Sequence, residues 1–208
     1  MLKIKGFTLT NAIIFKDKNM TSENPVQKAK NSGWIIKLYP IVVVLFSIMI
    51  NSIFLQSPIV VELPTIEIIQ ILSISAALLV FNHSWIMTAT ELTRFRFNIF
   101  ASPEEWKSSG KNKTSISEAG QFEIDRHLNT HRNTTENLVY YLFLAMIFSF
   151  TSPEFLSASM WLLMFPLARL GYTYCYFRGK DNLRGIFMSL SLLSIYGLVS
   201  YLIINLFR

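Results

Sequence analysis

The sequence predicts an all-α integral membrane protein, a helical bundle whose helices cross the bilayer. Hydrophobic residues make up 51% of its 208 residues and charged residues only 15%, whereas a soluble domain carries roughly 25% charged residues. The charged residues are clustered, and long uncharged runs separate the clusters. Because lipid offers no partner for backbone N–H and C=O groups, such runs are expected to cross the membrane as helices.

Five segments are candidates for membrane-spanning helices. About 18 uncharged residues are enough to cross the hydrocarbon core, and the five segments are 38–61, 68–90, 137–153, 155–177 and 185–207. The third is the shortest, but it continues a polar stretch that can supply the missing turn. The fourth is interrupted only by Arg169.

The positions of lysine and arginine indicate how the chain crosses the membrane. Basic residues gather before the first segment, between the second and third, and between the fourth and fifth. Five crossings place all three basic regions on one side, which the positive-inside rule makes cytoplasmic. Four crossings would put the first region opposite the others. We therefore expect a multi-pass protein with a cytoplasmic N-terminus.

Three regions follow from this pattern. Residues 1–33 form a polar N-terminal segment, residues 34–61 an extra transmembrane helix with its turn, and residues 66–208 a transmembrane domain of four helices. Segment 102–106, SPEEW, predicts the start of a short helix, with a serine N-cap and a proline in the first position. Segment 151–155, TSPEF, shows the same pattern and predicts the start of the next spanning helix.

The composition also bears on the class of partner. The net charge is +6, but no basic stripe or nucleic-acid motif appears, so no nucleic-acid partner is expected. Cys175 is the only cysteine, which excludes an intrachain disulfide. The three histidines, His83, His127 and His131, lack the spacing of metal ligands, so no metal site is expected.

Polar side chains gather on the helix that leads into the third apolar run. Arg126, Asn133 and Asn137 recur at helical spacing and share a face. Glu136 lies at the edge of that face, and His131 lies on a neighbouring one. Basic residues at a helix end can simply anchor it at the membrane surface. Anchoring does not account for Asn133, Glu136 and Asn137 where the apolar run begins.

A second polar set lies inside the fourth apolar run. Arg169, Tyr172 and Tyr176 follow helical spacing and share a face. A charge at this depth usually faces the bundle interior and has a partner or a ligand. One interpretation is an ion pair between Arg169 and Glu136 that joins two helices. The other is a binding site, and the two do not exclude each other.

Two further arginines complete the constellation. Arg94 lies at the end of the second apolar run, and Arg184 lies in the turn before the last. All the polar sets are predicted to meet at the cytoplasmic membrane surface. Arginine binds carboxylates in a bidentate manner, and glutamate pairs with an amine. The constellation therefore suits a small ligand with two carboxylates and an ammonium group.

Three stretches resemble the membrane-associated proteins in eicosanoid and glutathione metabolism. They are RHLNTHRNTTENLVYY (126–141), LARLGYTYCYFRGKDNLRG (167–185) and LTRFRFNIFASPEEW (92–106). The last resembles the microsomal glutathione transferase branch of that family. The resemblance covers residues 68–208 and leaves out the first predicted helix, which would be an addition to a four-helix subunit.

The resemblance implies a homotrimer that binds glutathione as a co-substrate near the cytoplasmic face, between neighbouring subunits. Arg184 corresponds to the arginine that activates the thiol. The implied glutathione-binding residues are Arg94, Arg126, His131, Asn133, Glu136, Arg169, Tyr172 and Tyr176. Leu128 and Asn129 stand where the family has adjacent arginines, which removes expected contacts to carboxylates.

The activity implied by the resemblance is that of a membrane-bound glutathione transferase or peroxidase. A guanidinium near the sulfur favours the thiolate, which is the nucleophile. The thiolate would attack a lipophilic electrophile or a lipid hydroperoxide dissolved among the membrane lipids. Three alternatives stay open. Arg184 could be a loop charge only, the chain could be a non-catalytic lipid- or glutathione-binding protein of the same fold, or it could be an unrelated transporter subunit. The lack of inverted repeats argues against the transporter.

Overall fold

The computed structural model of the chain describes residues 25–54 and 59–207, with side chains from residue 34 onward. Every regular element there is helical, which confirms the all-α prediction. The elements are α1 (Pro25–Phe54), α2 (Ile66–Phe97), α3 (Pro103–Ser109), the 3-10 turn η1 (Lys113–Ser115), α4 (Glu118–Ser149), α5 (Phe155–Phe177) and α6 (Asp181–Leu206). The chain divides into two compact units, Met1–Leu38 and Tyr39–Arg208.

Four described helices are long and apolar enough to cross a membrane, which identifies an integral membrane protein. They are Trp34–Phe54 within α1, and the whole of α2, α5 and α6. α4 is not among them because its first half is polar. Its apolar second half corresponds to the third predicted span, which stays a prediction. The expected polar segment 1–33 overlaps the start of α1, and residues 1–24 lie outside the described part.

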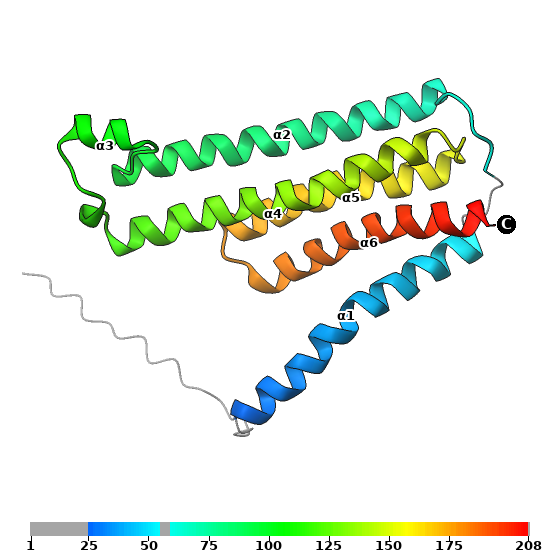
Figure 1. Cartoon of the computed structure of the whole chain (residues 1–208), viewed down its shortest axis with the longest axis horizontal. Coiled ribbons are helices and arrows are strands. Elements are labelled where there is room, and N and C mark those ends of the chain that lie inside the picture. The colour runs from blue at the N-terminus through cyan, green and yellow to red at the C-terminus, as the bar shows by residue number, and fades with distance from the viewer. Residues whose placement is uncertain (1–24, 55–58, 208) are drawn as a thin grey trace, which may run out of the picture. The chain divides into compact units, whose positions relative to one another are not determined.

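The helices α2, α4, α5 and α6 lie side by side along one axis (Figure 1). α5 packs against α2, α4 and α6, and its most extensive contact is with α6. Gly171 and Gly197 make this contact close, because a Cβ atom on either would overlap the ring of Phe187 or Trp161 respectively. The core of the bundle lies towards the end of α4 and the start of α5, around Trp161 and Phe165.

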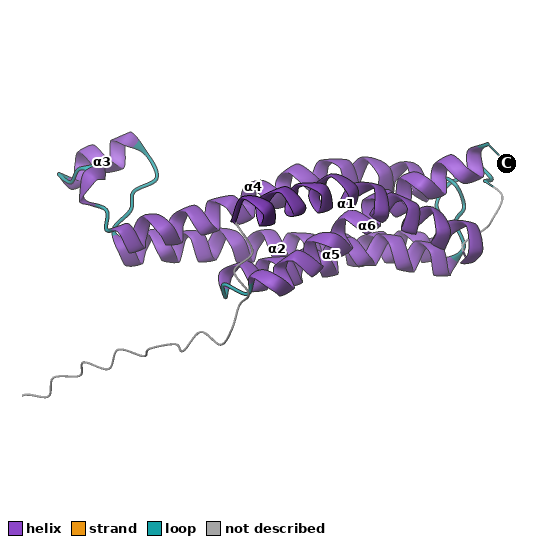
Figure 2. Ribbon diagram, turned by 90° about the horizontal axis from the view of Figure 1, so that it is seen from below, coloured by secondary structure: helices purple, strands orange, loops and turns teal. Residues whose placement is uncertain are grey.

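The helices α2 and α4 extend beyond α5 and α6 at the end of the bundle where α5 meets α6, and this part is called the extension (Figures 1 and 2). At 1.5 Å per residue, α2 and α4 are about 48 Å long and α5 about 35 Å. A separate apolar cluster holds the extension together, formed by Ile99 and Trp106 against Ile124 of α4. The indole Nε1 of Trp106 also donates a hydrogen bond of 2.9 Å to the backbone oxygen of Phe100.

The two helix starts predicted from their N-cap pattern have different outcomes. At α3, Ser102 is the N-cap and Pro103 follows it, so the prediction is confirmed. At α5 the prediction of Ser152 as the N-cap is wrong, because the helix begins at Phe155 with Glu154 as its N-cap. Ser152 adopts a left-handed φ of 47°, and its hydroxyl donates to the Oε2 atom of Glu62 at 3.3 Å.

A buried polar cluster joins the second half of α1 to the bundle. The amide of Asn51 is 1% exposed and donates to the backbone oxygen of Gly197 at 2.8 Å and to the Ser200 hydroxyl at 2.7 Å. Its Oδ1 atom accepts a hydrogen bond of 2.9 Å from Nε1 of Trp161. These three hydrogen-bond partners of Asn51 therefore all lie on α5 or α6.

Candidate functional site

A polar cavity opens where the first half of α4 meets the turn between α5 and α6. Its volume is about 350 Å³. The residues that line it are Phe122, Asp125, Arg126, Asn129, Tyr176, Gly179, Asp181 and Arg184. Three of the residues singled out from the sequence, Arg126, Tyr176 and Arg184, are thus brought together from three helices.

The α5–α6 turn places Arg184 beside the end of α5. Gly179 has a left-handed φ of 65°, and the backbone N–H of Lys180 donates to the Cys175 oxygen at 2.9 Å. This sharp reversal returns the first turn of α6 to the last turn of α5. The Arg184 guanidinium then lies 4.9 Å from the centre of the Tyr176 ring and 3.3 Å from the carboxylate of Asp181.

Arg126 ties α4 to the end of α5. Its Nη1 atom is 3.5 Å from the backbone oxygen of Phe177 and 3.6 Å from the carboxylate of Glu123. Its guanidinium also lies 4.9 Å from the centre of the Phe122 ring. Arg126 therefore presents a cation to the cavity while its contacts to both helices fix its position.

Arg169 lies deeper in the bundle and is fully buried. Its Nη1 atom donates to Oδ1 of Asn133 at 2.9 Å, and Nη2 is 3.5 Å from the Asn133 backbone oxygen. Glu136 is exposed and forms no ion pair with Arg169 among the described residues. The expected pair between Arg169 and Glu136 is therefore wrong within one chain, because α4 turns Asn133 rather than Glu136 towards α5.

Aromatic rings connect Arg169 to the cavity. The Arg169 guanidinium lies 5.2 Å from the centre of the Tyr172 ring. The rings of Tyr172 and Tyr176 are 5.6 Å apart, and Arg184 lies over Tyr176. The side chains of Arg169, Tyr172, Tyr176 and Arg184 thus form a continuous ladder. Such cation–ring contacts stabilise a desolvated guanidinium by about 2 kcal/mol.

The histidines lie outside the cavity. The rings of His131 and His83 are 5.5 Å apart between α4 and α2. His127 packs on Phe177 with ring centres 4.2 Å apart. Burial holds the pKa of His127 below its ordinary value; the cation of Arg126 lowers it further and the Glu123 carboxylate opposes both. Within the described part of the chain, no group of three His, Cys, Asp or Glu side chains is placed to hold a metal ion.

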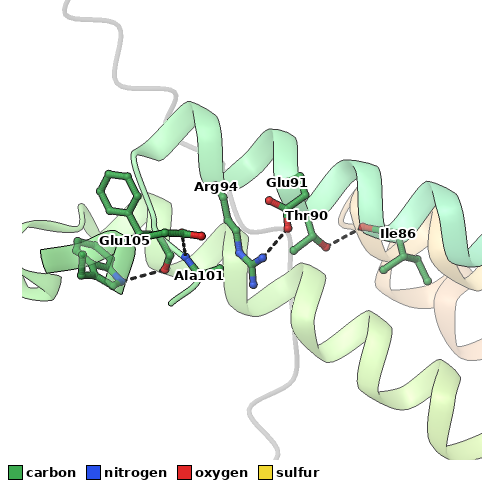
Figure 3. Close-up of polar contacts among 8 residues, drawn as sticks. Ile86, Thr90, Glu91, Arg94, Ala101 and Glu105 are labelled. Carbon is green, nitrogen blue, oxygen red and sulfur yellow. Dashed lines mark hydrogen bonds and ion pairs between the residues drawn. The ribbon is translucent and has the colours of Figure 1, made fainter. Parts of the chain in front are cut away.

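Arg94 also lies outside the cavity of the single chain. It occupies the last turn of α2 and forms an ion pair with Glu91 one turn earlier (Figure 3). Nearby, a carboxylate oxygen of Glu105 accepts a hydrogen bond of 2.8 Å from the backbone N–H of Ala101 (Figure 3). These contacts leave Arg94 on the extension of the bundle, separate from Arg126 and Arg184.

Sequence reasoning missed the acidic part of the cavity. Asp125 and Asp181 line it together with Arg126 and Arg184, so the formal charges of these four side chains cancel. The helical spacing of Phe122, Arg126 and Asn129 could have identified one wall, because residues separated by three or four share a face. Asp181 could have been found as the residue three positions before Arg184.

Known proteins resemble part of this chain. Prostaglandin E synthase of Canis lupus familiaris is 33% identical over 101 residues, which is 49% of this chain and 64% of that protein's length. Prostaglandin E synthase of Bos taurus is 30% identical over 115 residues, 55% of this chain and 73% of that protein. Microsomal glutathione S-transferase 1 of Sus scrofa is 27% identical over 116 residues, 55% of this chain and 75% of that protein.

The profile of the MAPEG family matches residues 72–204, which run from α2 through most of α6. The matched range contains every residue of the cavity and of the ladder. α1 lies outside it, and that α1 is a helix added to a four-helix subunit stays a prediction. The chain therefore belongs to the MAPEG family.

Proposed function

We propose that the protein is a membrane-bound glutathione transferase or peroxidase that activates glutathione for attack on lipophilic electrophiles or lipid hydroperoxides. The observation that carries this proposal is the cavity in which Arg126 and Arg184 meet beside Tyr176. Membership of the MAPEG family and similarity to a microsomal glutathione S-transferase support glutathione as the co-substrate. The candidate spans beside the cavity would give it access to substrates dissolved in lipid.

Charge explains how the cavity would act. A thiol with an ordinary pKa of about 8.5 is mostly protonated at neutral pH. The Arg184 guanidinium would favour the thiolate and so lower the thiol pKa. In transfer, the sulfur forms a bond to an electrophilic carbon as the leaving group departs with its electron pair. In peroxide reduction, the sulfur attacks the peroxide oxygen, and a second glutathione yields the disulfide, the alcohol and water.

The acidic side chains fit the other parts of glutathione. Glutathione carries two carboxylates and one ammonium group. Arg126 and Asn129 would hold a carboxylate, and Asp125 would pair with the ammonium group. Tyr176 would hold the Arg184 guanidinium in place through the ring contact.

We also propose a homotrimer with a cytoplasmic N-terminus. Glu136 is exposed and Arg94 lies away from the cavity of one chain, so both would complete the site from a neighbouring subunit. Cross-linking of the protein in membranes, followed by electrophoresis, should give cross-linked species of up to three copies and no larger species. A Glu136→Ala variant should weaken glutathione binding in calorimetry without changing the number of copies.

The test of activity is direct. Purified protein mixed with glutathione should show thiolate absorbance in the ultraviolet and should conjugate a hydrophobic chlorinated aromatic. Arg184→Ala should abolish turnover and the thiolate signal. Arg96→Ala is the matched control, because Arg96 is exposed on α2 and does not line the cavity. Full turnover by Arg184→Ala would refute the assignment.

One observation favours a second candidate, a non-catalytic lipid- or glutathione-binding protein of the same fold. Asn129 lines the cavity where the family motif has an arginine, and two aspartates balance the remaining arginines. A cavity without excess positive charge holds a thiolate less strongly. Binding of glutathione by calorimetry without thiolate absorbance or turnover would establish this alternative.

A further inference from the structure

Two cations share one exposed aromatic ring at the end of α5. The Arg178 guanidinium lies 6.0 Å and the Lys180 ammonium 5.2 Å from the centre of the Tyr174 ring. All three side chains are exposed, and Tyr174 is 42% exposed. They lie outside the polar cavity, which is lined by Gly179 but by none of these three.

No carboxylate compensates this charge within the described residues. The ion pairs found there join Arg94 to Glu91, Arg126 to Glu123 and Arg184 to Asp181. Asp181, which follows Lys180 directly, is thus paired with Arg184. Arg178 and Lys180 therefore present two unneutralised positive charges to their surroundings.

The position of the ring relates this charge to the membrane. Tyr174 lies in the last turn of a candidate span, Phe155–Phe177. Leu156 and Leu167 precede it by 18 and 7 residues, so at 3.6 residues per turn all three share one face of α5. Leu156 and Leu167 are 62% and 53% exposed. An outward apolar stripe thus runs along the span and ends at a tyrosine with two cations.

This arrangement matches the chemistry of a phospholipid from tail to headgroup. Tyrosine is enriched where hydrocarbon meets water, with its ring in the interface. Arginine binds phosphate oxygens in a bidentate manner, and lysine supplies a point charge. Apolar side chains on the same face offer a surface for an acyl chain. Charge complementarity favours an anionic lipid, because a zwitterionic headgroup brings its own cation.

We propose that Tyr174, Arg178 and Lys180 form a binding site for the phosphate headgroup of one anionic phospholipid, whose acyl chain lies along the outward face of α5. The bound lipid would hold the α5–α6 turn, which leads into the first turn of α6 with Arg184, at the membrane surface. The site is independent of the proposed activity, because none of its residues lines the polar cavity.

The test is native mass spectrometry of the full chain in detergent, with added phosphatidylglycerol or phosphatidylcholine. Wild-type protein should retain phosphatidylglycerol in preference. Each basic side chain near an anionic surface contributes about a factor of five in affinity. The double variant Arg178→Gln, Lys180→Gln should therefore bind phosphatidylglycerol about 25-fold more weakly, with phosphatidylcholine unchanged.

The control is Lys107→Gln, Lys111→Gln, which removes the same charge. Lys111 also lies over an aromatic ring, that of Phe100 at 6.0 Å, but on the extension beyond the α5–α6 turn (Figure 1). Screening over about 8 Å should keep these lysines from acting on the α5–α6 turn, so this variant should retain phosphatidylglycerol. Circular dichroism confirms that both variants fold.

Three results would overturn the proposal. Equal loss of phosphatidylglycerol in both double variants would mean diffuse attraction rather than a site. Full retention by Arg178→Gln, Lys180→Gln would mean that these cations do not bind the headgroup. A change in the number of copies per complex in that variant would mean that another protein chain covers this surface.

Discussion

Arg169 donates a hydrogen bond of 2.9 Å to the side-chain oxygen of Asn133, and this amide, not a carboxylate, is its partner inside the bundle. We expect Asn133→Leu to destabilise the protein by about 2 kcal/mol, because it leaves a buried guanidinium without this acceptor. The free energy of unfolding can be measured by titration with dodecyl sulfate. Asn129→Leu, at an exposed amide on the same helix, should change it by less than about 0.5 kcal/mol. Equal effects of the two would contradict the assignment.

The cluster around Asn51 predicts that the second half of α1 is fixed to its own bundle. Asn51→Leu should lower stability by about 1 kcal/mol, since it removes the acceptor of Trp161 Nε1 and the amide that donates to the Ser200 oxygen, and hydrogen bonds between membrane helices are worth about this much.

A cross-link tests the same contact. The hydroxyl oxygens of Ser47 and Ser200 are 3.2 Å apart. Cysteines at both positions, with Cys175→Ser, should form a disulfide under mild oxidation and keep the mobility of a single chain. Cysteines at Ser47 and Ser73 serve as the control, because Ser73 is exposed and its hydroxyl donates to the backbone oxygen of Ile69 in its own helix. A disulfide-linked dimer would show that α1 docks on another copy.

Two glycines of α6, one packed against α5 and one not, give a prediction with a matched control. Gly197→Ala should cost about 1–3 kcal/mol, because its methyl group would overlap the Trp161 ring and force repacking. Gly185→Ala meets nothing within 4 Å and should be neutral or stabilise α6 by up to about 1 kcal/mol. The thermal unfolding midpoint should therefore fall for Gly197→Ala and stay the same or rise for Gly185→Ala.

The contact between Arg184 and Tyr176 predicts that the proposed reaction requires an aromatic ring at position 176. Tyr176→Phe keeps the ring and should keep most of the turnover. Tyr176→Leu should reduce turnover about fivefold, because a cation–ring contact of about 1 kcal/mol no longer holds the guanidinium. Conjugation rates at saturating glutathione measure both. If the phenylalanine variant is as slow as the leucine variant, the hydroxyl rather than the ring is what matters.

His127 predicts a loss of stability in mild acid. Its pKa is lowered chiefly by burial, so the unfolded chain takes up a proton at a higher pH than the folded one. The stabilisation is complete above the ordinary pKa of 6.5 and is lost as the pH falls towards the folded pKa. Thermal midpoints measured from pH 7.5 to 5 should fall for wild type and fall less for His127→Gln. Lys111→Gln, an exposed substitution outside α4, should behave as wild type.

Local signals predicted the elements well where the decisive interactions lie within a few residues. Ser102 and Pro103 start α3 as expected because the cap is made within one turn. The same Ser-Pro pattern does not make Ser152 an N-cap, because the end of α4 and a hydrogen bond to Glu62 set the backbone conformation there. Helix starts between two packed helices thus depend on tertiary contacts that a short motif does not contain.

The site was predicted in part for a similar reason. Helical spacing places Asn133 and Glu136 near one face, and the sequence alone does not fix how far α4 is rotated towards α5. The structure turns Asn133 inward, so Arg169 meets an amide instead of a carboxylate. The convergence of Arg126 and Arg184 was accessible, because both precede predicted spans on the same predicted side of the membrane.

The Asn51 cluster also constrains the order of events during synthesis. Its partners lie 110 to 149 residues further along the chain. The ribosome therefore finishes α1 long before it has synthesised Ser200, so α1 is made before the partners of Asn51 are available. Docking of the first helix is consequently among the last steps of maturation, and a chain truncated before α6 has no Gly197 or Ser200 to receive it.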